Sequence, residues 1–354
     1  SLTNTSHNVF VGNDAGASAT STGAIGIGHD ALKAYTGTGV VAIGYEAGIN
    51  LTSGPNTVAI GYQAGKALTT NGYSVFIGHQ AGLEHTGGNN VAIGDRAFFS
   101  TNAGASSLAS TFNVAIGNRA LGGTFTDAAV VGTVAVGYLA LGQATMGGID
   151  YNIAIGQESQ RFNAGGQNIG IGYSTIRLAG SGETGNVAIG TSVMDVLDNA
   201  GSNYNVAIGN YSLRGGTGLL ARNIAIGYVA MGETRTNNIG GVDNIFVGYQ
   251  AGGGDWETAD SSYNIGIGSY ALDAALNGAL RNVGMGYEVL TDLTSGYDNV
   301  AIGYRALMNL TSGFQNVATG VGAGASLTTG YFNVMIGYES GYSSTTIRNT
   351  FMGY

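Results

Sequence analysis

The sequence predicts an all-β fold, a parallel β-solenoid of about 20 rungs, on three observations. A phrase such as Asn113-Val-Ala-Ile-Gly117 or Asn299-Val-Ala-Ile-Gly303 recurs twenty times, at steps of 16 to 23 residues. A unit this short cannot hold a core of its own, so successive units must stack. The 64 Gly among 354 residues disfavour long helices, and β-branched residues at fixed places of the repeat favour short strands.

The repeat runs from residue 8 to residue 354 without a linker, which predicts a single fibre domain, 1–354, with longer loops in the rungs between about 95 and 268. The chain has a net charge of −9 and only 9% charged residues, so it lacks the basic stripe of nucleic-acid-binding proteins. Polar residues and Gly interrupt every apolar stretch, which argues against membrane insertion. With no Cys, disulfides and thiolate metal sites are excluded.

The closing Gly of each phrase serves as the reference for one rung. The two flanking positions, three and one before this Gly, hold Val or Ile in 19 and 17 of the 20 units. Side chains two apart lie on one face of a strand, so we expect both positions to face the interior of the coil. Representatives of this predicted core are Val114, Ile116, Val206, Ile208, Val300 and Ile302.

The middle position, two before the Gly, is usually Ala or Gly, as in Ala42, Ala115 and Ala207. A small apolar column suits close packing against another chain, so we expect the middle positions to lie at a chain-to-chain contact. After the Gly, a segment such as Tyr45-Glu-Ala-Gly48 predicts a second short strand whose Ala lines a narrow interior corner. A turn such as Leu310-Thr-Ser-Gly313 then leads to the next rung.

Asn stands four before the closing Gly in 15 of the 20 units. Its amide can bond the equivalent amide one rung away, as in stacked Asn ladders. We therefore assign Asn113, Asn152, Asn205 and Asn299 to a structural ladder rather than to a catalytic site.

The repeated phrase Asn-Val-Ala-Ile-Gly-x-x-Ala resembles the head domain of trimeric autotransporter adhesins, and even more the Gly-Tyr-Gln-Ala repeats of bacteriophage tail fibres and related bacterial surface fibres. The resemblance covers essentially the whole chain. It implies a left-handed β-roll, a homotrimer and a place in a virion tail fibre or on an extracellular cell surface. The partner it implies is a host cell-surface glycan or protein receptor.

On this basis we expect a structural and adhesive fibre segment, most simply part of a phage tail or receptor-binding fibre that contacts host surface glycans. One alternative is a bacterial surface adhesin head of the trimeric autotransporter type. Another is a polysaccharide-degrading tailspike, which needs two facing acids in a cleft. We expect no enzyme activity, no catalytic residue, no cofactor and no metal, since the four His show no pairing suited to zinc.

Two groups of side chains are candidates for function. The loop that follows Gly252 holds the only Trp of the chain, and a tryptophan face beside carboxylates is suited to binding a sugar. Its candidate receptor-binding residues are Asp255, Trp256, Glu257 and Asp260. The second group begins with Asp14, Asp30 and Glu46, which share the position two after the closing Gly and continue as Gln63, Gln80, Arg96 and Arg119. We interpret this column as a solvated polar ladder.

Overall fold

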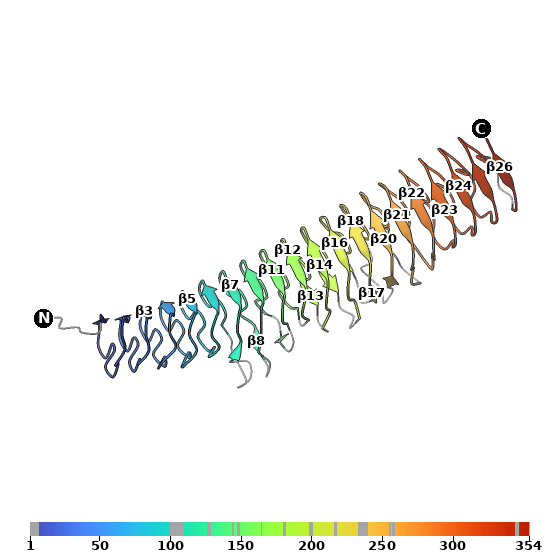
Figure 1. The fold of residues 1–354 in the computed structure, drawn as a ribbon. Coiled ribbons are helices and arrows are strands. Elements are labelled where there is room, and N and C mark those ends of the chain that lie inside the picture. Colours follow the sequence, from blue (N-terminus) through green and yellow to red (C-terminus); the bar gives the residue numbers. More distant parts are fainter. Residues whose placement is uncertain are drawn as a thin grey trace. The chain divides into compact units, whose positions relative to one another are not determined.

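The computed structural model shows a repetitive coil of short parallel strands (Figure 1). It describes residues 7–99, 109–125, 129–143, 145–146, 149–163, 165–179, 182–197, 201–215, 218–232, 240–254, 256, 259–343 and 347–353. Contacts within the chain define two compact units, Ser1–Ser174 and Thr175–Tyr354, and each unit is described by itself. No helix occurs among the residues described.

The first unit contains ten main strands of three residues, one for each rung. They are β1 (Val9–Val11), β2 (Ile25–Ile27), β3 (Val41–Ile43), β4 (Val58–Ile60), β5 (Val75–Ile77), β6 (Val91–Ile93), β7 (Val114–Ile116), β9 (Val134–Val136), β11 (Ile153–Ile155) and β12 (Ile169–Ile171). Neighbouring rungs pair in parallel and in strict repeat register, so that Val41 lies beside Val58 and Ile43 beside Ile60. The longer rungs add a second parallel pair, β8 (Thr124–Phe125) with β10 (Thr145–Met146).

The second unit repeats this plan with ten main strands. They are β14 (Val187–Ile189), β16 (Val206–Ile208), β18 (Ile224–Ile226), β20 (Ile245–Val247), β21 (Ile265–Ile267), β22 (Val283–Met285), β23 (Val300–Ile302), β24 (Val317–Thr319), β25 (Val334–Ile336) and β26 (Thr350–Met352). Two small parallel pairs accompany them, β13 (Leu178–Ala179) with β15 (Val196–Leu197), and β17 (Leu220–Ala221) with β19 (Gly241–Val242). The predicted all-β parallel solenoid is therefore confirmed.

The expected facing of the main strands is wrong. The middle residue is buried in rung after rung, for example Ala115, Ala207 and Ala301, each with no exposed surface. The flanking residues lie on the outside of the single chain, where Ile302 is 40% exposed. The same correction applies to the whole predicted core, because Ile116 and Ile208 are exposed and Val114, Val206 and Val300 are only half-buried.

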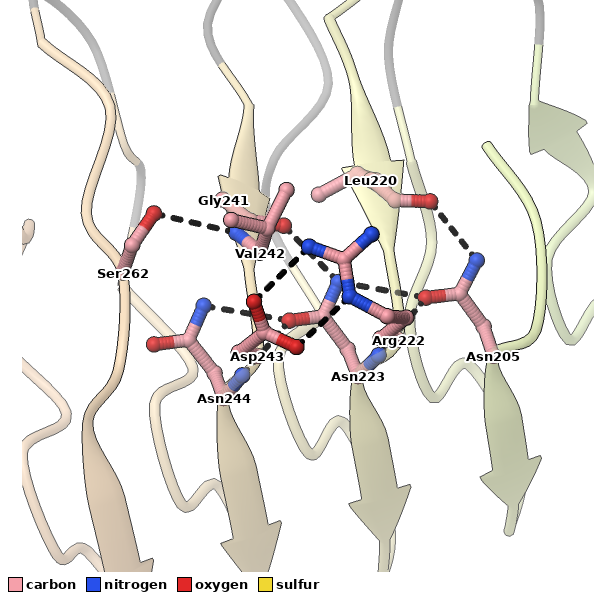
Figure 2. Close-up of polar contacts among 9 residues, drawn as sticks. All are labelled: Asn205, Leu220, Arg222, Asn223, Gly241, Val242, Asp243, Asn244 and Ser262. Carbon is pink, nitrogen blue, oxygen red and sulfur yellow. Dashed lines mark hydrogen bonds and ion pairs between the residues drawn. The ribbon is translucent and has the colours of Figure 1, made fainter. Parts of the chain in front are cut away.

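The Asn ladder explains this facing. Residues four and two before the closing Gly lie on the same side of the strand. Asn205, Asn223 and Asn244 are fully buried and bond one another from rung to rung (Figure 2). Because a buried amide needs such partners, the strand turns its Asn inward, and the middle Ala follows. The expected contact of the middle Ala column with another chain is therefore also wrong.

Each amide in the ladder has several partners. The side-chain Oδ1 of Asn205 accepts from the backbone N–H of Asn223 at 2.9 Å and from the Nδ2 of Asn223 at 3.1 Å. The Nδ2 of Asn205 donates to the carbonyl oxygen of Leu220 at 2.7 Å. The assigned residues Asn113 and Asn299 make equivalent contacts one rung back, to Asn90 and Asn282 respectively. Asn152 also follows this pattern, since its Oδ1 accepts from the backbone N–H of the next rung's Asn168 at 2.8 Å.

The segment after the closing Gly forms consecutive turns, not the expected second strand. Its second and fourth residues are left-handed, as in Arg305 with φ 56° and Leu307 with φ 50°. This alternation prevents an extended conformation, and the backbone amides form hydrogen bonds with adjacent rungs instead. The backbone N–H of Arg305 donates to the backbone carbonyl of Tyr287, and that of Leu307 donates to the carbonyl of Ala323, both at 3.0 Å. The Ala between them, Ala306, is buried in the predicted interior corner.

The closing Gly brings neighbouring rungs into close contact. Gly28 has φ 132°, and a Cβ at this position would overlap the backbone carbonyl of Gly44 in the next rung. Only Gly fits this combination of left-handed backbone and close approach. The interior is completed by leucines of the inter-rung turns, such as Leu310 and Leu327, which are fully buried.

Candidate interaction surfaces

The outer face of the main strands is a surface that repeats in every rung of each unit. We define the outer face as the two flanking positions and the residue after the closing Gly. No flanking position carries a charge in any of the twenty units. In a typical rung Ile302 is 40% exposed and Tyr304 is 44% exposed. Soluble monomers rarely expose contiguous apolar patches beyond a few hundred Å², so this column of rungs is a candidate contact surface.

Aromatic rings stack from rung to rung along one edge of the outer face. In the first unit, the rings of Tyr45 and Tyr62 are parallel within 10°, with centroids 5.3 Å apart. In the second unit, Tyr287 and Tyr304 stack in the same way at 5.6 Å. The rung spacing of about 4.8 Å permits such stacking whenever neighbouring rungs both carry an aromatic residue.

The column that contains Asp14, Asp30 and Glu46 forms a polar ladder. Gln63 donates to Glu46 at 2.9 Å, Gln80 donates to Gln63 at 3.1 Å and Arg96 donates to Gln80 at 3.3 Å. Hydrogen bonds from Lys66, at 2.6 Å, and from Gln63 lower the pKa of Glu46. A carboxylate held ionised by these donors is suited to structure rather than to general acid catalysis.

The loop with the only Trp is arranged differently from the expectation. Trp256 is 2% exposed, and its ring packs edge-to-face on Phe246 with centroids 6.1 Å apart. It also covers Gly241, where an added Cβ would lie 2.5 Å from the indole Cζ3. Trp256 is therefore a core residue of the second unit and not an exposed sugar platform.

The other predicted receptor-binding residues do not supply that platform. Asp260 is exposed, and its Oδ1 accepts from the backbone N–H of Gly240 at 2.8 Å, which ties two rungs together. Asp255 and Glu257 lie outside the described residues. The glycine at 241, one rung away, is the position in the sequence that leaves room for this large side chain.

A pocket of about 380 Å³ lies on the first unit, and sequence analysis had not identified it. Its side chains are Arg96, Phe99, Arg119, Leu139, Gln143 and Phe162. Its backbone lining comes from Gly122, Gly123 and Gly142, which stand at the start of two of the longer loops between rungs. The available signal was a pair of arginines at the same repeat position in consecutive rungs of an acidic chain.

Two further classes of site receive no support from the geometry. Across the described ranges, no cluster of three or more His, Asp or Glu side chains could hold a metal ion. Within the same ranges, no helix has the length and apolarity that a membrane crossing requires.

The fold and its surfaces define a β-solenoid repeat protein. Comparison with known proteins adds no family: no family model, no curated protein and no solved structure matches this chain.

Proposed function

We propose that this chain is a structural and adhesive segment of a fibre in which copies of the chain pack side by side through the outer face. The single observation that carries the proposal is the uncharged, half-exposed pair of Val and Ile columns along each unit. Burying this surface would contribute about 25 cal/mol for each Å² removed from water. An unassociated chain would leave that contribution unused.

A second copy of the same chain is the partner that fits this surface best. The outer face repeats once per rung, and another solenoid carries the same spacing, so every rung of one copy meets an equivalent rung of the other. The flanking positions bring no charge to the contact, so like charges do not oppose it. Following the resemblance described above, we propose three copies, each wound left-handed, in a tail or receptor-binding fibre that contacts host surface glycans.

The test is the molar mass of the chain and of a variant with a charged outer face. Sedimentation equilibrium at micromolar concentration should give three times the 35.6 kDa chain mass. A triple variant, Ile267→Asp with Ile302→Asp and Ile336→Asp, places charges on three exposed residues of the outer face and should lower the mass to that of one chain. Its far-ultraviolet circular dichroism should still report strands.

The matched control carries the same three charges elsewhere. Ser295→Asp, Ser312→Asp and Thr329→Asp fall on exposed residues of the inter-rung turns and should leave the mass unchanged. A wild-type mass of one chain, or equal masses for both triple variants, would contradict assembly through the outer face.

A further inference from the structure

The pocket of the first unit contains two arginines without carboxylate partners. Five other arginines of the described part form ion pairs with an acidic side chain: Arg161, Arg214, Arg222, Arg281 and Arg305. Among the described residues, Arg96 donates its Nε to the neutral Gln80 and lies over the ring of Phe99 at 5.7 Å. The guanidinium of Arg119 has no side-chain partner in the same part of the chain. Relative to the described residues, each arginine therefore retains N–H donors that no side chain accepts.

The repeat register holds these two arginines side by side. Both stand two after a closing Gly, in consecutive rungs, and the backbone N–H of Arg119 bonds to the carbonyl of Asp95 at 2.9 Å. Both are left-handed, with φ of 51° and 52°. Equivalent positions in neighbouring rungs lie about 4.8 Å apart, so the two side chains can donate to the same anionic group.

Two described acids that neighbour the pocket residues, Asp95 before Arg96 in the chain and Glu158 beside Arg161, are already engaged. Asp95 contacts His79 at 2.8 Å and accepts from Asn118 at 3.0 Å. Glu158 pairs with Arg161 at 3.1 Å. None of the described residues that line the pocket is acidic, although the chain has 21 acidic and only 12 basic residues. The pocket therefore has a local positive charge in a negatively charged chain, as expected of a site for an anion.

The other residues that line the pocket suit a sugar attached to the anionic group. Phe99 and Phe162 are half-buried, and the guanidinium groups of Arg96 and Arg161 lie over their rings at 5.7 and 4.9 Å, so the ring surface that these cations leave uncovered is what a ligand can contact. Gln143 is exposed; its Oε1 accepts from the Nε of Arg161 at 2.9 Å, and its amide N–H can donate to a hydroxyl group. Gly122 and Gly142 keep the floor close to Arg119, because a Cβ at either position would lie 2.9 Å from the Arg119 carbonyl oxygen. A volume of about 380 Å³ is within the range of small-molecule sites.

We propose that this pocket binds an acidic saccharide, with Arg96 and Arg119 on its carboxylate or phosphate and the phenyl rings against the C–H faces of the sugar. This inference deepens the glycan contact in the proposed function and rests on it. The site itself lies within one chain, so its binding can be measured whether or not the chain assembles.

The test is isothermal titration of the full chain with four probes: glucuronate, glucose 6-phosphate, glucose and inorganic phosphate. At least one acidic sugar should bind at least tenfold more tightly than both glucose and inorganic phosphate. Preference between glucuronate and glucose 6-phosphate identifies the carboxylate or the phosphate as the anionic group. Equal binding of an acidic sugar and inorganic phosphate, or no binding of any probe, would overturn the proposal.

Variants decide whether the two arginines are responsible. Arg119→Gln and Arg96→Gln place at these positions the residue that Gln63 and Gln80 supply at the same left-handed position of other rungs, so the coil should be retained. Each should weaken acidic-sugar binding at least tenfold. The control Arg281→Gln removes an exposed, paired arginine in the second unit and should leave binding unchanged. Undiminished binding in both pocket variants would overturn the proposal.

Measuring the molar mass of the same samples separates the two proposals. Acidic-sugar binding by a single chain would contradict assembly and leave the pocket intact. An assembled chain that binds none of the probes would contradict the pocket alone.

Discussion

The ring of Phe76 occupies the space that a side chain at Gly82 would fill, since a Cβ added at Gly82 would lie 2.5 Å from the ring. Phe76 is at a middle position, and Gly82 stands four after the closing Gly of the same rung. Other rungs have the small residue at the middle position and the large one four after the closing Gly, as in Ala301 with the buried Leu307. The narrow interior thus accommodates one large side chain from either of the two positions.

This relationship predicts a reciprocal pair of substitutions. Gly82→Leu should destabilise the chain by about 1 to 3 kcal/mol through overpacking against Phe76. The backbone is not the cause, because Leu307 adopts φ 50° where Gly82 has φ 62°. Phe76→Ala alone should cost about 3 to 5 kcal/mol through the cavity it leaves.

The double variant Phe76→Ala with Gly82→Leu should be more stable than the Phe76→Ala variant, because the leucine fills part of the cavity. Urea unfolding of the wild type and the three variants measures the coupling. Strictly additive losses would show that the two positions do not share one space.

The Asn ladder predicts that the loss of a single side-chain amide lowers the stability of the chain strongly. Asn205→Ala should leave the Leu220 carbonyl and the Asn223 backbone N–H without their side-chain partner, at a cost of about 1 to 3 kcal/mol for each buried group. Arg222→Ala, next to the ladder but exposed, should change stability little. Thermal unfolding compares the two, and equal effects would contradict a structural role for the ladder.

The burial of Asp273 predicts that the difference in stability between the wild type and an Asp273→Asn variant depends on pH. Burial raises the pKa of its carboxyl to about 6, from an ordinary value of 3.8. The folded state therefore binds this proton more tightly than the unfolded state, and ionisation of Asp273 costs stability as pH rises between about 4 and 6.

Asp273→Asn removes this cost, so the variant should match the wild type near pH 4 and exceed it in melting temperature near pH 7.5. The half-buried carboxylate of Asp298 has its pKa lowered from 3.8 by the hydrogen bond from Arg281. Its contribution to stability is lost only as the pH falls below about 4, so Asp298→Asn should lower the melting temperature at neutral pH and approach the wild type in acid. A difference between wild type and Asp273→Asn that does not change with pH would contradict the burial of this carboxyl.

The repeat was sufficient to predict the main strand of each rung, the parallel stacking of these strands and the polar ladder, because each depends on spacing alone, whereas the expected second strand after the closing Gly is a series of turns. The facing of the strands could not be read from hydrophobicity. Val300 and Ile302 look like core residues, yet the buried Asn299 and Ala301 share the other side of the strand. The apolar flanking columns therefore face outward, contrary to the rule that the larger apolar residues are inside.

The site predicted around Trp256 is wrong for a related reason. A single Trp is a candidate binding residue because it is unusual in the chain, whereas Trp256 fills the space above Gly241. The pocket around Arg96 and Arg119 depends on side chains that converge from several rungs and on the free donors of both arginines. Neither property can be read from the position of a residue within its repeat.

Thiol labelling tests whether the outer face is a contact between copies of the chain. The chain has no Cys, so an Ile302→Cys and an Ala301→Cys variant each carry one thiol in adjacent positions of the same strand. If copies pack through the outer face, the Ile302→Cys thiol should react slowly with a maleimide at concentrations where sedimentation shows the assembly and rapidly where it shows one chain, while the Ala301→Cys thiol should react slowly in both. Rapid reaction of the Ile302→Cys thiol at every concentration would contradict packing through the outer face.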